Sequence, residues 1–188
     1  MTKLVVVLDA CVIIPMPLCD TLLRMIEANL FRFHISEQIL EESTRNLAKI
    51  LAKRQNITIE KALLKAKKRV EQIKLAFPES LVEPKQKIIN TLTNEPKDRH
   101  VLAAAIEAKA SLIITANLKD FPPDTTEFYG IKAISPDDFL VTLVNLYGSL
   151  KVKDILYRQA KAVNLDVNDI LMKLKNNSNI DEFVNILI

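Results

Sequence analysis

Three carboxylates stand where a sheet of parallel strands would bring them together. Asp9 directly follows the aliphatic run at residues 4–8, and Asp120 follows a second such run at residues 112–115. Ligands of open α/β sheets bind outside the carboxyl ends of the strands, so we expect both acids in one crevice. Asp98 adds a third carboxylate in the first turn of a predicted helix. A helix cap, a helix dipole or a turn would explain any one of these acids, but not their convergence.

A fourth acid is expected on the helix that begins after Ser36, but periodicity leaves its position open. At about 100° per residue, Glu41 and Glu42 flank the apolar stripe of this helix on opposite sides and at nearly equal distance. Either glutamate can therefore face the crevice. Asn117 offers a further oxygen after the second aliphatic run.

These residues describe a site whose ligands are oxygen atoms. Clustered carboxylates repel one another unless a hard cation neutralises them, and all-oxygen ligation suits Mg²⁺ or Mn²⁺ rather than zinc. Such ions typically act on phosphate esters, where they lower the pKa of an attacking water and stabilise the leaving oxygen. The acids therefore predict metal-dependent hydrolysis of a phosphate ester.

Other chemistries are disfavoured by the remaining residues. His100 lies beside Asp98, but the second histidine, His34, is distant in sequence, which disfavours a metal-free ribonuclease with two histidines. The chain has two glycines, too few for a glycine-rich phosphate loop. Cys11 and Cys19 lie in or beside apolar segments and are predicted to be reduced, buried thiols without a function.

Strands and helices alternate along most of the chain. Gly148 follows a predicted helix and is the best linker, which divides the chain into residues 1–147 and a C-terminal helical extension at residues 148–188. The alternation predicts an α/β fold, in which helices cover both sides of a mostly parallel sheet. The predicted strands lie at residues 4–8, 31–35, 80–83, 112–115 and 131–134.

Positive charge is concentrated on two predicted helices. Ser36 is the N-cap of the first, which runs to about Gln55, and Thr58 or Asn56 caps the second. The net charge is only +3, but residues 45–74 contain ten basic and two acidic residues. This segment would attract a polyanion such as nucleic acid. A solvated helix face is the alternative interpretation.

The chain shows no feature of a membrane or secreted protein. No uncharged apolar stretch approaches the ~18 to 20 residues that a spanning helix needs. The first residues do not form a signal peptide, since Met1, Thr2 and Lys3 lead into a short apolar run and then an acid. We therefore expect a soluble, cytoplasmic protein.

Three stretches of the sequence resemble the PIN-domain family. They are LDACVIIP, ISEQILEES and PKDRHVLAAAIEAKASLIITANLKDF, and the resemblance covers about residues 3–140. This family comprises metal-dependent ribonucleases, including VapC-like toxins of bacterial toxin–antitoxin pairs. The resemblance implies a PIN-like α/β/α sandwich and endonucleolytic hydrolysis of RNA that leaves a 5′-phosphate and a 3′-hydroxyl. The helices after Gly148 resemble the C-terminal extension of a larger subgroup of these toxins.

The resemblance also implies roles for individual residues. The carboxylates that would hold one or two Mg²⁺ or Mn²⁺ ions are Asp9, Glu42, Asp98 and Asp120. Thr115 would orient a carboxylate or a water. Asn117 stands where the family commonly has aspartate, so Asp120 would supply the charge and Asn117 only an oxygen. The residues expected to hold the RNA backbone are Arg99, Arg45, Lys49, Lys61, Lys65, Lys68 and Arg69.

Two other functions stay open at the level of sequence. One is a non-catalytic RNA- or protein-binding module, which the asparagine at position 117 favours. The other is the same nuclease chemistry in RNA processing, without an antitoxin. The expected partners are an RNA substrate and an antitoxin protein whose segment enters the acidic crevice. A homodimer is left open, and no contact with a membrane is expected.

Overall fold

A computed structural model describes residues 3–188 of the protein. Its centre is a five-stranded sheet in the order β3-β2-β1-β4-β5, and every pairing between strands is parallel. The predicted α/β fold with a mostly parallel sheet is therefore confirmed, with each strand close to its expected position. The strands are β1 (Val5–Leu8), β2 (Arg32–Ser36), β3 (Leu81–Val82), β4 (Leu112–Ile114) and β5 (Lys132–Ile134).

The two central strands end side by side. The register pairs Leu8 of β1 with Ile114 of β4, so the next residues, Asp9 and Thr115, leave the sheet together. The Asp9 N–H donates to the Ile114 carbonyl at 3.1 Å, which continues the pairing by one step. Because parallel strands have their carboxyl ends at one edge, side chains after β1, β2 and β4 meet there.

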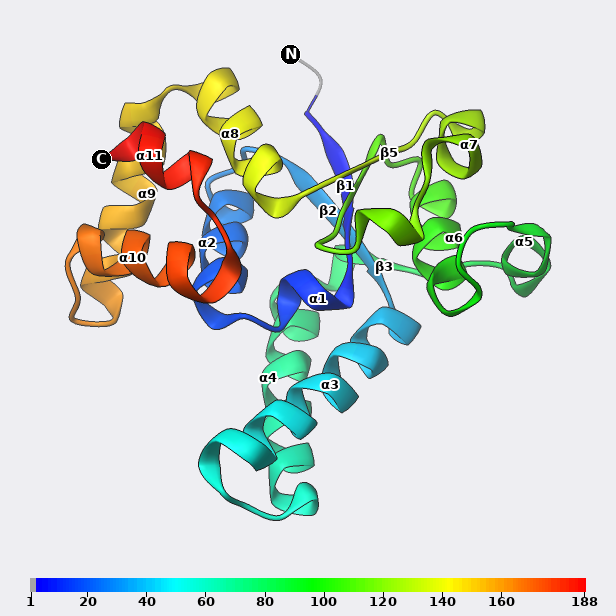
Figure 1. The fold of residues 1–188 in the computed structure, drawn as a ribbon, viewed down its shortest axis with the longest axis horizontal. Coiled ribbons are helices and arrows are strands. Elements are labelled where there is room, and N and C mark those ends of the chain that lie inside the picture. The colour runs from blue at the N-terminus through cyan, green and yellow to red at the C-terminus, as the bar shows by residue number, and fades with distance from the viewer. Residues whose placement is uncertain (1–2) are drawn as a thin grey trace.

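Helices cover both sides of this sheet (Figure 1). The helices α5 and α6 lie on one side, α2 and α8 to α11 lie on the other, and α3 and α4 form a hairpin that projects from the carboxyl edge. The helices are α1 (Ala10–Ile13), α2 (Met16–Glu27), α3 (Glu37–Gln55), α4 (Ile59–Ala76), α5 (Gln86–Thr91), α6 (Arg99–Glu107), α7 (Pro123–Thr126), α8 (Pro136–Tyr147), α9 (Ser149–Ala162), α10 (Val167–Ser178) and α11 (Glu182–Leu187).

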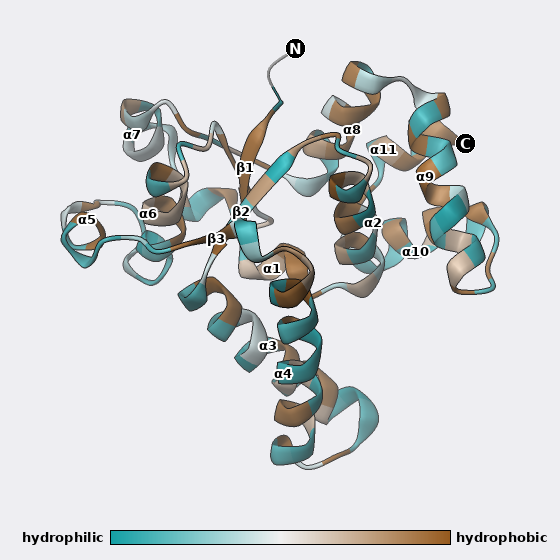
Figure 2. Cartoon of the chain, turned by 180° about the vertical axis from the view of Figure 1, so that it is seen from behind, coloured by the Kyte–Doolittle hydropathy of each residue, from teal (hydrophilic) through white to brown (hydrophobic). Residues whose placement is uncertain are grey.

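The α3–α4 hairpin is built from local capping signals and a small core of its own. Ser36 accepts a hydrogen bond from the Ile39 N–H at 3.3 Å, and Thr58 accepts one from the Lys61 N–H at 3.4 Å. Asn56 does not cap α4 but ends α3 with a left-handed φ of +50°. Figure 2 shows that both helices carry mostly hydrophilic residues around apolar stretches. The buried residues of the hairpin core are Leu47, Ala48, Ala62 and Ala66.

The three C-terminal helices share the core of the sheet. Leu156 of α9 and Phe183 of α11 are fully buried and belong to the same continuous cluster as Val6 of β1. The Asp137 carboxylate of α8 accepts hydrogen bonds from the backbone N–H groups of residues 181–183 at 2.8–3.0 Å, which fixes the start of α11. The predicted boundary between residues 1–147 and the extension at residues 148–188 stays a prediction.

Three short helices, α1, α5 and α7, were not expected from the sequence. The helix α1 has four residues, too few to show a helical period, and it begins at the Asp9 cap. The helix α5 has six residues and none of them is buried. Within residues 3–188, no helix is both long and apolar enough to cross a membrane.

Candidate functional site

Asp9 is the most firmly held acid of the site. Its side chain is buried at the end of β1. The oxygen Oδ1 accepts a hydrogen bond from the Ala10 N–H at 2.6 Å and so caps α1. The oxygen Oδ2 accepts one from the Thr115 hydroxyl at 2.7 Å, across from β4. The expected convergence of the two strand ends is therefore present, and Asp9 is both a helix cap and a member of the acidic crevice.

Cys11 lies in the same crevice and was not expected there. Its Sγ donates to Asp9 Oδ2 at 3.1 Å and accepts from the Ala116 N–H at 3.3 Å. The prediction of a buried cysteine without a function is wrong for Cys11, which is only half-buried and supports Asp9, and correct as to burial for Cys19. Burial and the charge of Asp9 raise the pKa of Cys11 to about 12, so it stays a protonated donor.

Asp98 and Asp120 face one another across a lysine. Asp98 ends the 3₁₀ turn Pro96–Asp98, and Asp120 ends the 3₁₀ turn Leu118–Asp120. The Lys97 ammonium Nζ lies 3.8 Å from Asp98 Oδ2 and 3.5 Å from Asp120 Oδ2. Asp98 stands at the N-cap position of α6 but makes no side-chain hydrogen bond to it.

Burial and the neighbouring acids raise the pKa of Asp98. Asp98 as a whole residue is 6% exposed. Burial, as the largest cause, together with the charges of Asp9, Asp120 and Glu42, raises the pKa of Asp98 from 3.8 to about 7 against the opposing effect of Lys97. The other three acids therefore lie within electrostatic reach of Asp98, although all four come from separate segments.

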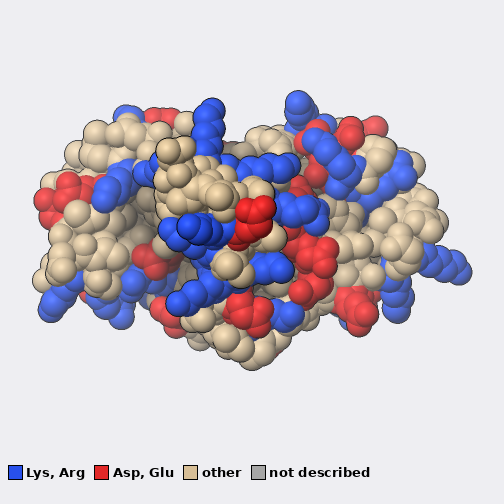
Figure 3. Space-filling view, turned by 90° about the horizontal axis from the view of Figure 1, so that it is seen from below, with Lys and Arg blue, Asp and Glu red and all other residues tan. Residues whose placement is uncertain are grey.

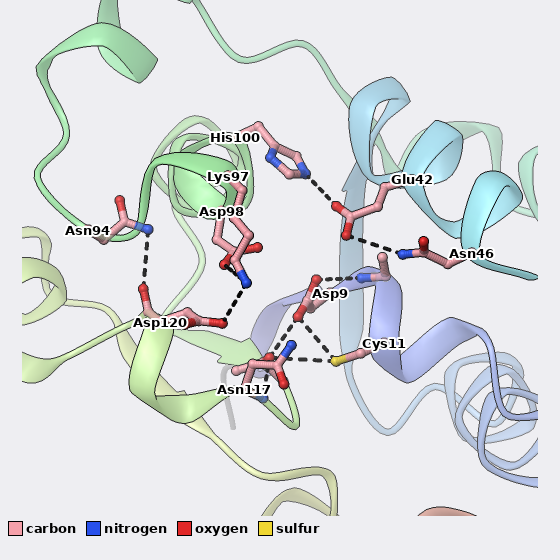
Figure 4. A network of polar contacts seen from close by, with 12 residues as sticks. Asp9, Cys11, Glu42, Asn46, Asn94, Lys97, Asp98, His100, Asn117 and Asp120 are labelled. Atoms are coloured by element: carbon pink, nitrogen blue, oxygen red, sulfur yellow. Dashed lines mark hydrogen bonds and ion pairs between the residues drawn. The ribbon is translucent and has the colours of Figure 1, made fainter.

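The structure decides between the two glutamates of α3. Glu42 points into the crevice, where its Oε2 lies 3.3 Å from His100 Nε2 of α6 and its Oε1 accepts a hydrogen bond from Asn46 at 3.5 Å. Glu41 is exposed and pairs with Arg45 at 3.8 Å. Figure 4 shows Glu42 on the far side of the space that Asp9, Asp98 and Asp120 surround.

Asn117 is placed differently from the acids. Its backbone N–H donates to Thr115 Oγ1 at 3.0 Å, which holds the threonine toward Asp9, while its side chain is exposed. Asp120, by contrast, is buried and faces Lys97. Of these two residues after β4, only Asp120 presents a buried carboxylate to the crevice.

Comparison with known proteins agrees with this geometry. Residues 5–119 match the family described as "PIN domain", which is more than half of the 188 residues. The chain belongs to the PIN-domain family. The matched range includes three of the acids, Asp9, Glu42 and Asp98, and ends one residue before Asp120. The family resemblance inferred from the sequence motifs is thereby confirmed.

One relative of this PIN domain bears on its activity. Over 60 residues, the chain is 52% identical to "Putative ribonuclease VapC50" of Mycobacterium tuberculosis (strain ATCC 25618 / H37Rv). These residues make up 32% of this chain and 36% of that relative, so the likeness covers about a third of each protein. No solved structure matches the chain.

The basic residues of the PIN domain fall into two groups. Arg69 donates to the Ile13 carbonyl at 2.8 Å, and Arg99 donates to the Asn94 carbonyl at 3.2 Å, so both hold the protein's own backbone. Lys65 reaches Gln55 at 2.6 Å but is exposed. Figure 3 shows basic side chains gathered over the projecting hairpin, with acidic ones among them. The exposed basic residues among those predicted to contact RNA are Arg45, Lys49, Lys61, Lys65 and Lys68.

A groove of about 550 Å³ lies beside the acids of the PIN domain. Its walls come from α3 and from the start of α6, with Asn46 and Glu42 on one side and Pro96, Lys97 and His100 on the other. A second groove, of about 630 Å³, lies between α3 and α4 and includes none of the four acids. Of the four acids, Glu42 lines the first groove, together with Glu41 and Lys97.

The crevice fits a hard divalent cation by the chemistry of its donors. No three His, Cys, Asp or Glu side chains in the described part of the chain are already grouped closely enough to hold an ion. Each acid is instead held by neighbours: Asp9 by Thr115, Glu42 by His100, and Asp120 by Lys97. Asp98 Oδ2, however, is buried without a hydrogen-bond partner. A buried carboxylate oxygen of this kind, surrounded by like charges, is satisfied by a cation.

Proposed function

We propose that this PIN domain is a metal-dependent endoribonuclease that hydrolyses RNA phosphodiesters to 5′-phosphate and 3′-hydroxyl ends. The observation that carries the proposal is the convergence of four carboxylates from four segments at the carboxyl edge of the sheet. Burial and the charges of Asp9, Asp120 and Glu42 raise the pKa of Asp98, so this carboxylate lowers the stability of the metal-free fold, as is common at functional sites. The name of the relative, a ribonuclease, supports RNA as the substrate.

Each acid would contribute a carboxylate oxygen to one or two Mg²⁺ or Mn²⁺ ions. The ligands would be Asp9, Glu42, Asp98 and Asp120. A bound divalent ion would lower the pKa of the attacking water and stabilise the leaving oxygen. Thr115 and Cys11 bind one oxygen of Asp9, and Asn46 donates to one oxygen of Glu42, so these acids are oriented before any ion would bind.

The α3–α4 hairpin would hold the RNA backbone. Its exposed lysines Lys49, Lys61 and Lys68 would contact phosphate groups, and contacts of this type position a strand without reading its sequence. Arg69 and Arg99 would contribute indirectly, because they fix α1 and the turn before α6. Asn117, exposed at the edge of the crevice, would supply only a neutral oxygen.

The proposal is tested by incubating the purified protein with total RNA and sequencing the 5′-phosphorylated ends. We expect new ends with Mn²⁺ or Mg²⁺ and none with EDTA. The matched inactive protein is Asp120→Asn, since the carboxylate of Asp120 contacts only Lys97 among the described side chains. New ends that appear equally with Asp120→Asn would come from a contaminating nuclease, and retention of intact RNA in the presence of metal would support a non-catalytic binding module instead.

We further propose that the protein is a cytoplasmic toxin of a type II toxin–antitoxin system. Its antitoxin would be a protein with a segment that enters the acidic crevice through the groove beside α3 and α6. A short neighbouring reading frame that encodes a DNA-binding domain and a disordered tail would support this role. If the product of that frame does not suppress cleavage in the same assay, the protein would instead be a nuclease of RNA processing.

A further inference from the structure

Lys97 is a cation already positioned between two acids of the site. Its Nζ lies within 4 Å of both Asp98 Oδ2 and Asp120 Oδ2. The two carboxylate side chains are each 8% exposed, whereas the lysine side chain is 64% exposed. The ammonium therefore reaches the acids from the solvent side, along the wall of the groove that Lys97 helps to form.

The backbone beneath Lys97 is fixed while its side chain is long and flexible. Pro96 begins the 3₁₀ turn, and the Asp98 N–H donates to the Glu95 carbonyl at 2.9 Å. Asn94, which is buried, links this turn to the Asp120 carbonyl at 3.5 Å. A four-carbon stem can move its ammonium by several ångströms without disturbing such a backbone.

We propose that Lys97 is a tethered counter-ion that competes with the divalent ion for Asp98 and Asp120. Without metal, its ammonium neutralises part of the charge of the crevice, and it moves out into the groove when an ion enters. The inference rests on the proposed function only in that it takes these two aspartates as metal ligands. It concerns the binding of the metal and requires no statement about RNA.

The physical argument for displacement is that Lys97 holds the acids weakly. An ammonium at 3.5–3.8 Å from a carboxylate, with most of its side chain in water, forms a screened pair of small net stability. A divalent ion carries twice the charge and would contact more carboxylates at once. It would also bind Asp98 Oδ2, which has no hydrogen-bond partner. Both cations cannot occupy the same space, so occupation by one lowers the affinity for the other.

The alternative is that Lys97 is an ordinary surface ion pair that stabilises the fold. In that case its removal would lower the melting temperature. The metal affinity would change only by the general effect of removing one positive charge near the acids. Lys119 provides the matched control for that loss. It is exposed, lies next to Asp120 in the chain and has no ion pair within residues 3–188.

The experiment is a titration of full-length protein with Mn²⁺, in which free Mn²⁺ is followed by electron paramagnetic resonance. We expect Lys97→Met and Lys97→Gln to bind Mn²⁺ about three- to tenfold more tightly than the wild-type protein, because the competing ammonium is removed. Lys119→Met is expected to change the affinity by less than about twofold, since its charge is separated from the acids by water. The melting temperature should also rise further on adding Mn²⁺ to Lys97→Met than to the wild type.

Two results would overturn the inference in distinguishable ways. Equal Mn²⁺ affinity in the wild type and both Lys97 variants, or equal tightening in Lys97→Met and Lys119→Met, would remove the competition and leave the nuclease proposal intact. A wild-type protein that binds no Mn²⁺ would overturn the metal site itself, and with it both proposals.

Discussion

At the scale of single residues, the site is a set of acids whose charges oppose folding. Asp98 shows this most directly, because it is buried among carboxylates and one of its oxygens has no hydrogen-bond partner. Asp9 differs, since both of its oxygens accept hydrogen bonds from groups on α1 and β4. Replacing the two aspartates should therefore have opposite effects on stability, although each replacement should abolish cleavage.

Asp98→Asn should stabilise the metal-free protein at alkaline pH. The pKa of Asp98 is about 7 in the folded protein and 3.8 ordinarily. Below about pH 4 the carboxyl is protonated in both the folded and the unfolded state. Between about pH 4 and pH 7 it ionises in the unfolded chain first, so the free energy of unfolding falls as the pH rises. In EDTA at pH 8 we expect the variant to be more stable by on the order of 1–3 kcal/mol, with a smaller difference at pH 5.

Thermal melts at the two pH values, followed by circular dichroism, measure this difference. Asp124→Asn, at an exposed position of α7, is the control and should show no pH-dependent gain. A variant of Asp98 that melts below the wild type at pH 8 would contradict the argument from burial and like charge.

Asp9→Asn should lower stability instead. An amide keeps one acceptor oxygen, so it cannot accept from the Ala10 N–H at one atom and from Thr115 and Cys11 at the other. The expected cost is about 1 kcal/mol, a fall of a few degrees in melting temperature. Asp120→Asn, compared in the same melts, should lose less. Equal melting of both variants would show that the hydrogen bonds of Asp9 contribute nothing net.

At the scale of elements, the α3–α4 hairpin is a projecting arm with a core separate from that of the sheet. Its base is fixed by the Arg69 hydrogen bond to the end of α1 and by the pairing of Lys74 with Glu37 at 2.9 Å. In the described part of the chain, the side chains of Lys61 and Lys68 make no hydrogen bond or ion pair, and that of Lys65 binds only Gln55 of the same hairpin. They are therefore the part of the hairpin that is free to bind phosphate.

Reversing the charges of the arm should weaken RNA binding and flatten its dependence on salt. The triple variant Lys61→Glu, Lys65→Glu, Lys68→Glu removes up to three phosphate contacts, which should reduce the slope of log K against log salt by about 2 for a single strand. Arg69 is left unchanged because it holds α1. The measurement is RNA binding by fluorescence anisotropy at several salt concentrations in EDTA.

The matched control for the arm places the same charge change on the C-terminal helices. Lys153, Lys161 and Lys173 are exposed there, and their replacement by glutamate alters net charge equally. We expect this control to keep most of the slope. If both triple variants flatten the slope alike, the arm has no special role and its charge is a solvated face.

At the scale of the whole molecule, the last forty residues are part of one core. The apolar faces of α9 to α11 cover α2 and α8, and Thr21 of α2 donates to Gln159 of α9 at 2.8 Å within that interface. Burial of this extent is incompatible with helices that merely follow a flexible linker. The extension should therefore behave as a structural element of the PIN domain.

Ending the chain at Tyr147 should destabilise the remaining PIN domain. The truncation exposes the apolar faces of α2 and α8, and Phe183→Ala in the full chain should by itself cost about 3–5 kcal/mol, because the side chain is fully buried. The melting temperatures of both proteins provide the measurement. A truncated protein that melts at the wild-type temperature would support the predicted boundary between two independent units.

Local signals determined the elements, and contacts across the fold determined the site. Ser36 could be identified as a cap because a cap bonds within three residues of itself, whereas the choice between Thr58 and Asn56 came from the structure. The strand β1 could be identified because a strand covered on both faces is a continuous apolar run. Glu42 could not be separated from Glu41 by periodicity, because the deciding neighbour, His100, lies on another helix.

Sequence order alone determined that acids would gather at one sheet edge, because parallel strands end on the same side. Only the tertiary structure decided which groups hold them there. Cys11 and Lys97 looked ordinary in sequence. Their contacts with the Ala116 N–H and with Asp120 form only because the segment after β4, distant in sequence, folds against them.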